Sequence, residues 1–122
     1  MPWSTDFHDD FVAEYDALPE DVQDELQAIL KVLEQIGPLL GRPRVDTLNG
    51  SAHANMKEIR FDAADGVWRF AFDLNRDAIV LAGGDKSGMS ERRFYKQLIS
   101  KAGPRFTAHQ AKLRQQKKGR KK

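Results

Sequence analysis

Two arginines, Arg60 and Arg69, lie in neighbouring segments of the sequence "KEIRFDAADGVWRFAF" (57–72). In both segments apolar and polar residues alternate, which is the pattern of strands with one buried face. If the apolar residues of both strands are buried on one side, the two residue numbers of every opposed pair must sum to an odd number. With a four-residue loop at 63–66, Arg60 lies directly opposite Arg69. The sequence therefore predicts two like charges side by side on the polar face of a hairpin.

Like charges directly opposed on a sheet are destabilising, so the arginine pair requires an explanation. One interpretation is that Glu58 and Asp73, which lie on the same face as the arginines, screen the pair. The other is that the pair binds an anion, which is favoured by Lys86 because this residue follows the next strand and can join the same face. Arginine binds phosphate oxygens in pairs through its planar fork, so a nucleic-acid phosphate is the expected anion.

The charge is distributed unevenly along the 122 residues. Residues 1–36 carry ten acidic side chains and one basic one, whereas residues 37–122 carry 19 basic and eight acidic ones. From Lys86 onward, Glu91 is the only acidic residue among 13 Lys and Arg. Such asymmetry is typical of a protein whose basic end meets a polyanion, although two solvated faces of opposite sign would have the same composition.

The acidic first third predicts a helical hairpin. Apolar residues recur at helical spacing over 7–18, with Ser4 or Thr5 placed to cap the helix. A second apolar stripe runs through 20–36 and ends at Gly37. We expect the two helices to share a buried apolar seam.

The period then changes from 3.6 to 2, which predicts a sheet. Residues 37–55 are punctuated by Gly and Pro and are expected to be a connector. The third strand is apolar on both faces and should be central. The expected strands cover residues 57–61, 67–74 and 78–84.

A basic helix is expected after the sheet, capped by Ser90 and ended by Gly103, with Pro104 opening a further helix. The predicted fold class is α+β: an N-terminal helical hairpin packed on a small antiparallel sheet, followed by a C-terminal helix. We expect one domain over residues 1–113 and a basic tail over 114–122 that is disordered in isolation.

Several kinds of site and location are disfavoured by composition. The chain has no cysteine, so disulfides and thiolate metal sites are excluded. His8, His53 and His109 are far apart in sequence, so we expect no zinc site. No apolar run approaches the roughly 20 residues of a membrane helix. The first residues lack the layout of a signal peptide, so a cytoplasmic location is expected.

The order of these motifs resembles the RelE/ParE toxin superfamily, and most closely its HigB-like, phage-related branch. The resemblance covers roughly residues 19–102, and its motifs are "LLGRPRVDTLNG", "MKEIRF", "VWRFAF", "AIVLAGGDKSG" and "SERRFYKQL". It implies a RelE-like fold and the toxin of a type II toxin–antitoxin system. It also implies partnership with an antitoxin protein, the ribosome and mRNA.

The implied activity is that of a ribosome-dependent mRNA endonuclease without metal or cofactor, in which the RNA 2′-hydroxyl attacks the adjacent phosphate and leaves a 2′,3′-cyclic end. Carried over by position, Arg60 and Arg69 would contact the scissile phosphate and Lys86 would stabilise the transition state. Tyr95 would stack on a base or help to transfer a proton, unless it only fills the core. The candidates for RNA contacts are Lys57, Arg92, Arg93 and Lys96, of which the last three could instead form a solvated helix face.

His53 precedes the first strand and is a further candidate acid or base, since histidine titrates near neutrality. Two other functions remain open. A ParE-like protein would inhibit DNA gyrase without cutting RNA, and a non-catalytic RNA-binding regulator would use only the basic half of the chain. In the regulator, replacing Arg60 or Arg69 would weaken binding modestly and in a salt-dependent way.

Overall fold

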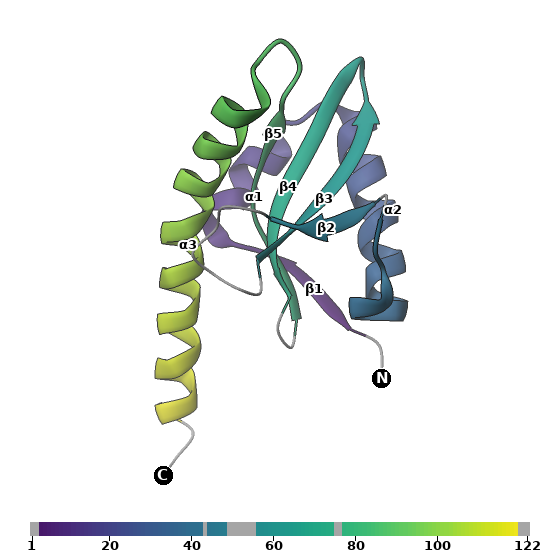
Figure 1. The fold of residues 1–122 in the computed structure, drawn as a ribbon. Coiled ribbons are helices and arrows are strands. Elements are labelled where there is room, and N and C mark those ends of the chain that lie inside the picture. The colour runs from purple at the N-terminus through teal and green to yellow at the C-terminus, as the bar shows by residue number, and fades with distance from the viewer. Residues whose placement is uncertain (1–2, 43, 49–55, 75–76, 120–122) are drawn as a thin grey trace.

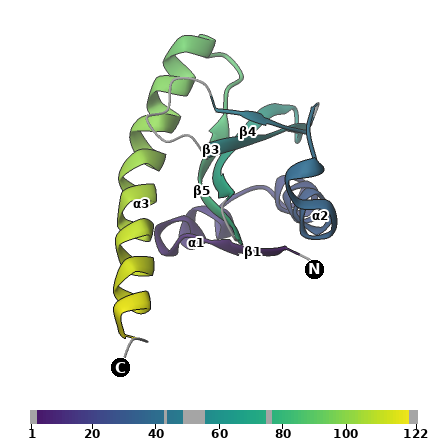
Figure 2. The same cartoon turned by 60° about the horizontal axis from the view of Figure 1, so that its bottom comes forward.

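The structure is a computed structural model that describes residues 3–42, 44–48, 56–74 and 77–119. A five-stranded sheet in the order β1-β5-β4-β3-β2 lies between two layers of helix (Figures 1 and 2). The elements are β1 (Ser4–Phe7), α1 (Asp9–Asp16), α2 (Glu20–Ile36), the 3-10 helix η1 (Gly37–Leu39), β2 (Val45–Thr47), β3 (Met56–Ala63), β4 (Gly66–Leu74), β5 (Asp77–Asp85) and α3 (Glu91–Gly119).

The predicted hairpin register is confirmed. β3 and β4 are antiparallel, and Arg60 is the direct partner of Arg69. The turn is tight, because Ala64 and Asp65 both have positive φ (49° and 59°), as in the primed turns whose twist suits hairpins. The third predicted strand, β5, is an interior strand between β1 and β4, although the middle strand of the five is β4.

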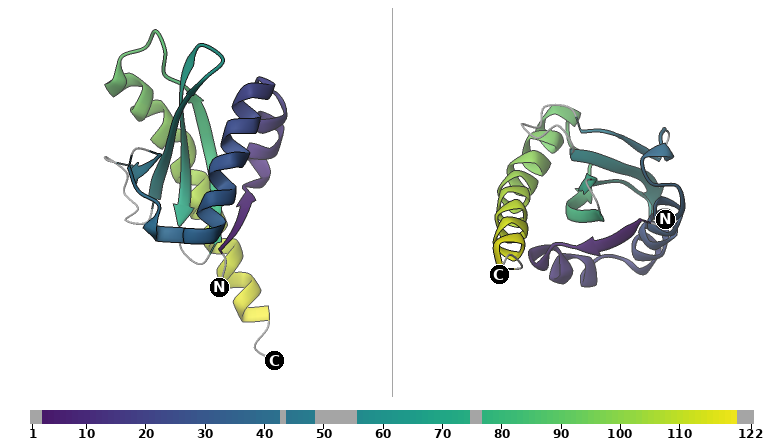
Figure 3. Two further views of the ribbon diagram at one scale, coloured as in Figure 1. Left: turned by 90° about the vertical axis from the view of Figure 1, so that its right-hand side faces the viewer. Right: turned by 90° about the horizontal axis from the view of Figure 1, so that it is seen from below.

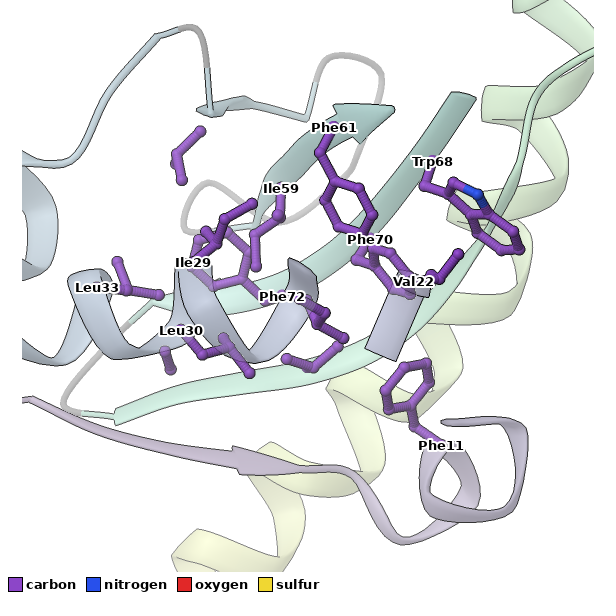
Figure 4. Close-up of a cluster of buried hydrophobic side chains, with 14 residues drawn as sticks. Phe11, Val22, Ile29, Leu30, Leu33, Ile59, Phe61, Trp68, Phe70 and Phe72 are labelled. Atoms are coloured by element: carbon purple, nitrogen blue, oxygen red, sulfur yellow. The ribbon is translucent and has the colours of Figure 1, made fainter. Parts of the chain in front are cut away.

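One face of the sheet packs on α1 and α2 through an aromatic and aliphatic core (Figure 4). Phe70 of β4 is completely buried at its centre, with ring centroids 5.6 Å from Phe61, 6.2 Å from Trp68 and 6.0 Å from Phe11. Together these side chains form a packed aromatic layer directly behind the hairpin.

The N-terminus and the connector differ from the sequence-based prediction. Residues 4–7 form a strand rather than the start of a helix, and α1 begins after His8, whose Nδ1 accepts a hydrogen bond from the Asp10 amide at 3.1 Å. β1 pairs in parallel with β5, so the sheet is mixed rather than antiparallel. A strand here satisfies the outer backbone edge of the buried β5, which a helix would leave unpaired. The expected connector contains β2, which pairs with β3.

The opposite face of the sheet packs on α3, which projects past the end of the sheet (Figures 1 and 3). The prediction that this helix ends at Gly103 is wrong, because α3 continues through Pro104. Its buried stripe of Phe94, Leu98, Ala102 and Phe106 crosses that position, and this packing outweighs the hydrogen bond that proline removes.

α3 runs on to Gly119 and so includes residues 114–119 of the segment that the sequence predicts to be a disordered tail. The division between a 1–113 domain and that tail stays a prediction. Residues 120–122 lie outside the described residues.

Candidate functional site

Arg60 and Arg69 lie on one face of the sheet and share a carboxylate. Glu58 Oε1 is 3.3 Å from Arg60 Nε and 3.8 Å from Arg69 Nε. The two like charges that the register brings together are therefore bridged by an opposite charge. Screening by Glu58 is confirmed. Asp73, the other carboxylate considered for that role, accepts a hydrogen bond from Gln110 of α3 at 3.2 Å.

The two arginines differ in exposure. Arg69 is 7% exposed, and its guanidinium donates a hydrogen bond of 2.8 Å to the Trp68 carbonyl. The Arg60 side chain is 31% exposed, and its guanidinium also lies 3.7 Å from Asp46 Oδ2. Arg60 contributes to the walls of two neighbouring pockets, of about 460 and 440 Å³. Arg69 is thus a fixed charge beneath the surface, and Arg60 is the part of the pair that a ligand meets first.

Glu58 is the site residue that the sequence did not identify as functional. It is 5% exposed, and Oε1 accepts a hydrogen bond of 2.8 Å from the Tyr95 hydroxyl. Burial raises the pKa of this carboxyl above its usual value, against the hydrogen bond from Tyr95 and the charges of Arg60 and Arg69, which lower it. In the sequence, only its spacing of two residues from Arg60, which puts both side chains on one face of the strand, pointed to Glu58.

Tyr95 joins the cluster from the first turns of α3, so the structure brings this predicted residue together with the arginine pair. Burial raises the pKa of Tyr95 to about 12, and the adjacent Glu58 carboxylate contributes in the same direction. The phenol therefore stays protonated at neutral pH and acts as a hydrogen-bond donor.

Lys86 reaches the cluster at its rim. Its ammonium lies 6.0 Å from the centroid of the Tyr95 ring, within the range of a cation–π contact. It also forms an ion pair of 3.1 Å with Glu91 at the start of α3. Lys86 is thus placed beside Tyr95 rather than against the arginines.

The four residues predicted to contact RNA fall in different places. Lys57 has the opposite parity to Arg60 on β3, and its ammonium donates to Thr47 Oγ1 at 3.3 Å, so it is separated from the cluster. Arg92 lines the 440 Å³ pocket with Arg60 and Tyr95. Arg93 and Lys96 line a separate groove along α3, of about 500 Å³, with Gln97, Ser100 and Lys101.

The remaining candidates do not join the site. His8 caps α1, and burial lowers the pKa of its imidazole. His109 is half-buried on α3, and His53 lies outside the described residues. Among the residues described, no three His, Asp or Glu side chains are grouped so that they could hold a metal ion. The described helices include none with the length and apolar character needed to cross a membrane.

The chain is similar to known proteins in sequence and in fold. The model of the family described as "Phage derived protein Gp49-like (DUF891)" matches residues 13–107. The putative toxin HigB2 of Mycobacterium tuberculosis (strain ATCC 25618 / H37Rv) is 42% identical over 98 residues, covering 78% of this chain and 48% of that protein. The putative toxin HigB3 of the same organism is 43% identical over 89 residues, covering 73% of this chain and 77% of that protein.

The chain therefore spans about half the length of one of these relatives and three quarters of the other. A mutant of the E. coli toxin RelE, solved in the free state, superposes with a TM-score of 0.63 over 86% of this chain and 98% of its own. Its sequence identity of 17% means that this likeness concerns the fold alone.

Proposed function

This chain belongs to the phage-derived Gp49-like family and has the RelE fold, and from this premise we propose that it is the toxin of a type II toxin–antitoxin system that cleaves mRNA on the ribosome. The observation that carries the proposal is the cluster of Arg60, Arg69 and Tyr95 on one sheet face, where Arg60 and Tyr95 line one pocket and Arg60 and Arg69 line the neighbouring one. The similarity of the chain to the putative toxins HigB2 and HigB3 supports the toxin role.

The proposed reaction is attack by the RNA 2′-hydroxyl on its own 3′-phosphate. The new bond joins the 2′-oxygen to phosphorus, and the bond from phosphorus to the 5′-oxygen breaks, leaving a 2′,3′-cyclic phosphate. The nucleophile is part of the substrate, so the reaction needs no metal-bound water. The protein must orient the hydroxyl in line with the leaving oxygen and stabilise the charge that develops on the phosphoryl oxygens.

In this proposal, the arginine pair stabilises that developing charge. Arg69 is held in place by the Trp68 carbonyl and by burial, so its charge is pre-organised in a region of low dielectric. Arg60 is more exposed and binds the phosphate oxygens first. Lys86 adds positive charge at the rim, and Tyr95 takes part in proton transfer.

Basic residues of α3 extend the proposed RNA-binding surface beyond the pocket. Arg92 continues from the pocket, and Arg93 and Lys96 line the adjacent groove, where they contact the backbone of mRNA or ribosomal RNA. The acidic helix α2 covers the face of the sheet opposite α3 (Figure 3), and α1 meets α3 through an ion pair of 3.0 Å between Glu14 and Lys101. An antitoxin protein is the second proposed partner, and it neutralises the toxin.

The proposal is tested by inducing the protein in a bacterial host and mapping the 5′ ends of cellular mRNA, with and without an inhibitor that empties ribosomes. We expect growth arrest and translation-dependent cleavage, both lost in Arg69→Ala. Lys31→Ala removes a positive charge from exposed α2 on the other sheet face and serves as the matched control.

Two outcomes would contradict the proposal. Arrest with intact mRNA and DNA-damage signalling would indicate a gyrase inhibitor. Folded protein that causes neither arrest nor cleavage would leave an RNA-binding protein without toxic activity.

A further inference from the structure

We propose that Glu58 is the general base of the reaction, so that its carboxylate accepts the proton of the attacking 2′-hydroxyl. This inference rests on the proposed function, because it assigns a residue to a step that the arginines and Lys86 do not perform. Glu58 lines the 440 Å³ pocket together with Arg60 and Tyr95. A nucleotide in that pocket would meet its carboxylate beside Arg60, and Arg69 lines the neighbouring pocket of about 460 Å³.

Two other carboxylates line the same pocket, Asp46 and Glu91, and both differ from Glu58 in ways that make them weaker bases. Asp46 is bound by Arg42 through two contacts of 2.9 Å. The Glu91 side chain is 68% exposed and is paired with Lys86. The pKa of each is held below its usual value, for Asp46 by the Thr47 amide and Arg42, and for Glu91 by Lys86.

Glu58 has the environment that suits a base near neutral pH. It is the buried carboxylate of the three, and burial raises its pKa, while base strength follows pKa. The charged and titratable groups that face it are Asp46 from β2, Arg60 from β3, Arg69 from β4 and Tyr95 from α3.

A phosphate bound to the arginines would make Glu58 a still stronger base. In the free protein, the guanidinium groups of Arg60 and Arg69 stabilise its ionised form. A phosphate that takes over their hydrogen-bonding capacity reduces this stabilisation and adds a nearby negative charge. Both effects favour proton uptake by the carboxylate when the substrate is in place.

The protons balance through the contact between Glu58 and Tyr95. Glu58 takes the proton from the 2′-oxygen as that oxygen bonds to phosphorus, and Tyr95 gives its phenolic proton to the departing 5′-oxygen. The proton on Glu58 then returns to the Tyr95 oxygen along the 2.8 Å hydrogen bond. Neutralising Glu58 also removes the negative charge that helps to raise the pKa of Tyr95, so the phenol becomes a better acid during the step that needs one.

The test is single-turnover cleavage of an mRNA on purified, programmed ribosomes between pH 5 and 9. For wild type we expect a rate that falls on the acidic side as the base is protonated. Glu58→Gln should lower the rate about a hundredfold to a thousandfold and abolish this acid limb. Glu58→Asp should keep an acid limb, displaced from that of wild type. Asp46→Asn removes another carboxylate of the pocket and should keep an acid limb, because Glu58 remains; the limb should move to lower pH, since the Asp46 charge helps to raise the pKa of Glu58.

The proposal is overturned if Glu58→Gln cleaves within threefold of wild type, if it retains the acid limb, or if Asp46→Asn abolishes that limb as well. Should Glu58→Gln fail to fold, Glu58→Asp decides, because an unmoved acid limb would contradict the proposal. Wild-type protein that cleaves no RNA would instead contradict the proposed function itself. Cleavage that is indifferent to Glu58 would leave the proposed function standing and remove only the base.

Discussion

The β3–β4 hairpin has two faces of different character: one is apolar and packs on helices, and the other carries a charged cluster. On one face, Ile59, Phe61 and Phe70 pack against α1 and α2 without polar contacts of their side chains. On the other, Glu58, Arg60 and Arg69 form a charged cluster closed on one side by Tyr95. Successive side chains of a strand point to opposite faces, so neighbouring residues of the same strand belong in turn to the buried core and to the charged cluster.

The difference between the faces explains how like charges can be kept opposite each other. Register is fixed by the apolar face, because slipping by one residue would turn Phe70 toward α3. The same register places Arg60 opposite Arg69 on the charged face, and Glu58 offsets the repulsion between the two arginines. Changes on the apolar face should therefore affect folding first, and changes on the charged face should affect activity first.

Phe70→Ala should give the largest effect and acts through folding. Removing a fully buried ring that contacts three other aromatic rings should cost about 3–5 kcal/mol of unfolding free energy. Denaturant unfolding followed by circular dichroism measures the loss. Val32→Ala truncates an apolar side chain that is 45% exposed on α2, and it should cost less than 1 kcal/mol. Equal losses in the two variants would contradict the assigned core.

Arg69→Lys should reduce cleavage nearly as much as Arg69→Ala, by about a hundredfold to a thousandfold, or roughly 3–4 kcal/mol of transition-state stabilisation. Lysine keeps the charge but lacks the planar fork that bonds the Trp68 carbonyl while facing Glu58 and the substrate. Single-turnover cleavage on programmed ribosomes measures the loss. A lysine variant with wild-type activity would show that only net charge matters on this face.

A smaller effect is expected where α3 meets α1, away from the charged cluster. Arg105 donates to both oxygens of Glu14, at 2.9 and 2.7 Å, and to the Leu81 carbonyl. Glu14→Gln should cost about 1–2 kcal/mol of unfolding free energy at pH 7 and leave cleavage unchanged. Lost cleavage in a folded Glu14→Gln protein would mean that this contact also supports the site.

The cost of Glu14→Gln should also depend on pH in a fixed direction. The hydrogen bonds from Arg105 lower the pKa of Glu14 in the folded protein. Its stabilisation is therefore present above the unfolded pKa near 4.5 and is lost as the pH falls through the lower folded value. Unfolding curves of both proteins from pH 7 down to pH 3 should converge in acid. A difference that grows in acid would contradict the assignment.

The smallest effect is expected from Lys96→Ala on the groove of α3. Removing one backbone contact should weaken ribosome association a few-fold and reduce its dependence on salt by about one counterion, without changing the rate of the bound complex. Binding measured between 50 and 200 mM salt checks this. A lower rate at saturating ribosome concentration would place Lys96 in the reaction itself.

The parts of the fold that could be predicted were those set by local periodicity. The alternation around Arg60 and Arg69 was enough to give their register. The strand at 4–7 was missed because Phe7 stands at helical spacing from Phe11 and Tyr15, although it packs on both rings from a strand. The need to pair the edge of β5 is not visible locally. The helix across Pro104 was missed because the packing of α3 overrides a local breaker.

The candidate site was predictable only in part for the same reason. Parity placed Glu58 beside the arginines, but its burial depends on Tyr95, which lies 37 residues further along the chain. Lys57 was a candidate for RNA contact by residue type, yet the same alternation that placed the arginines separates it from their cluster.

The most direct test of the central claim is to identify the ends of the RNA fragments that purified protein produces on programmed ribosomes. We expect a 2′,3′-cyclic phosphate on the upstream fragment and a 5′-hydroxyl on the downstream one, with neither formed by Arg69→Ala. Fragments that end in a 3′-hydroxyl and begin with a 5′-phosphate would contradict attack by the 2′-hydroxyl, and with it the roles assigned to the charged face of the hairpin.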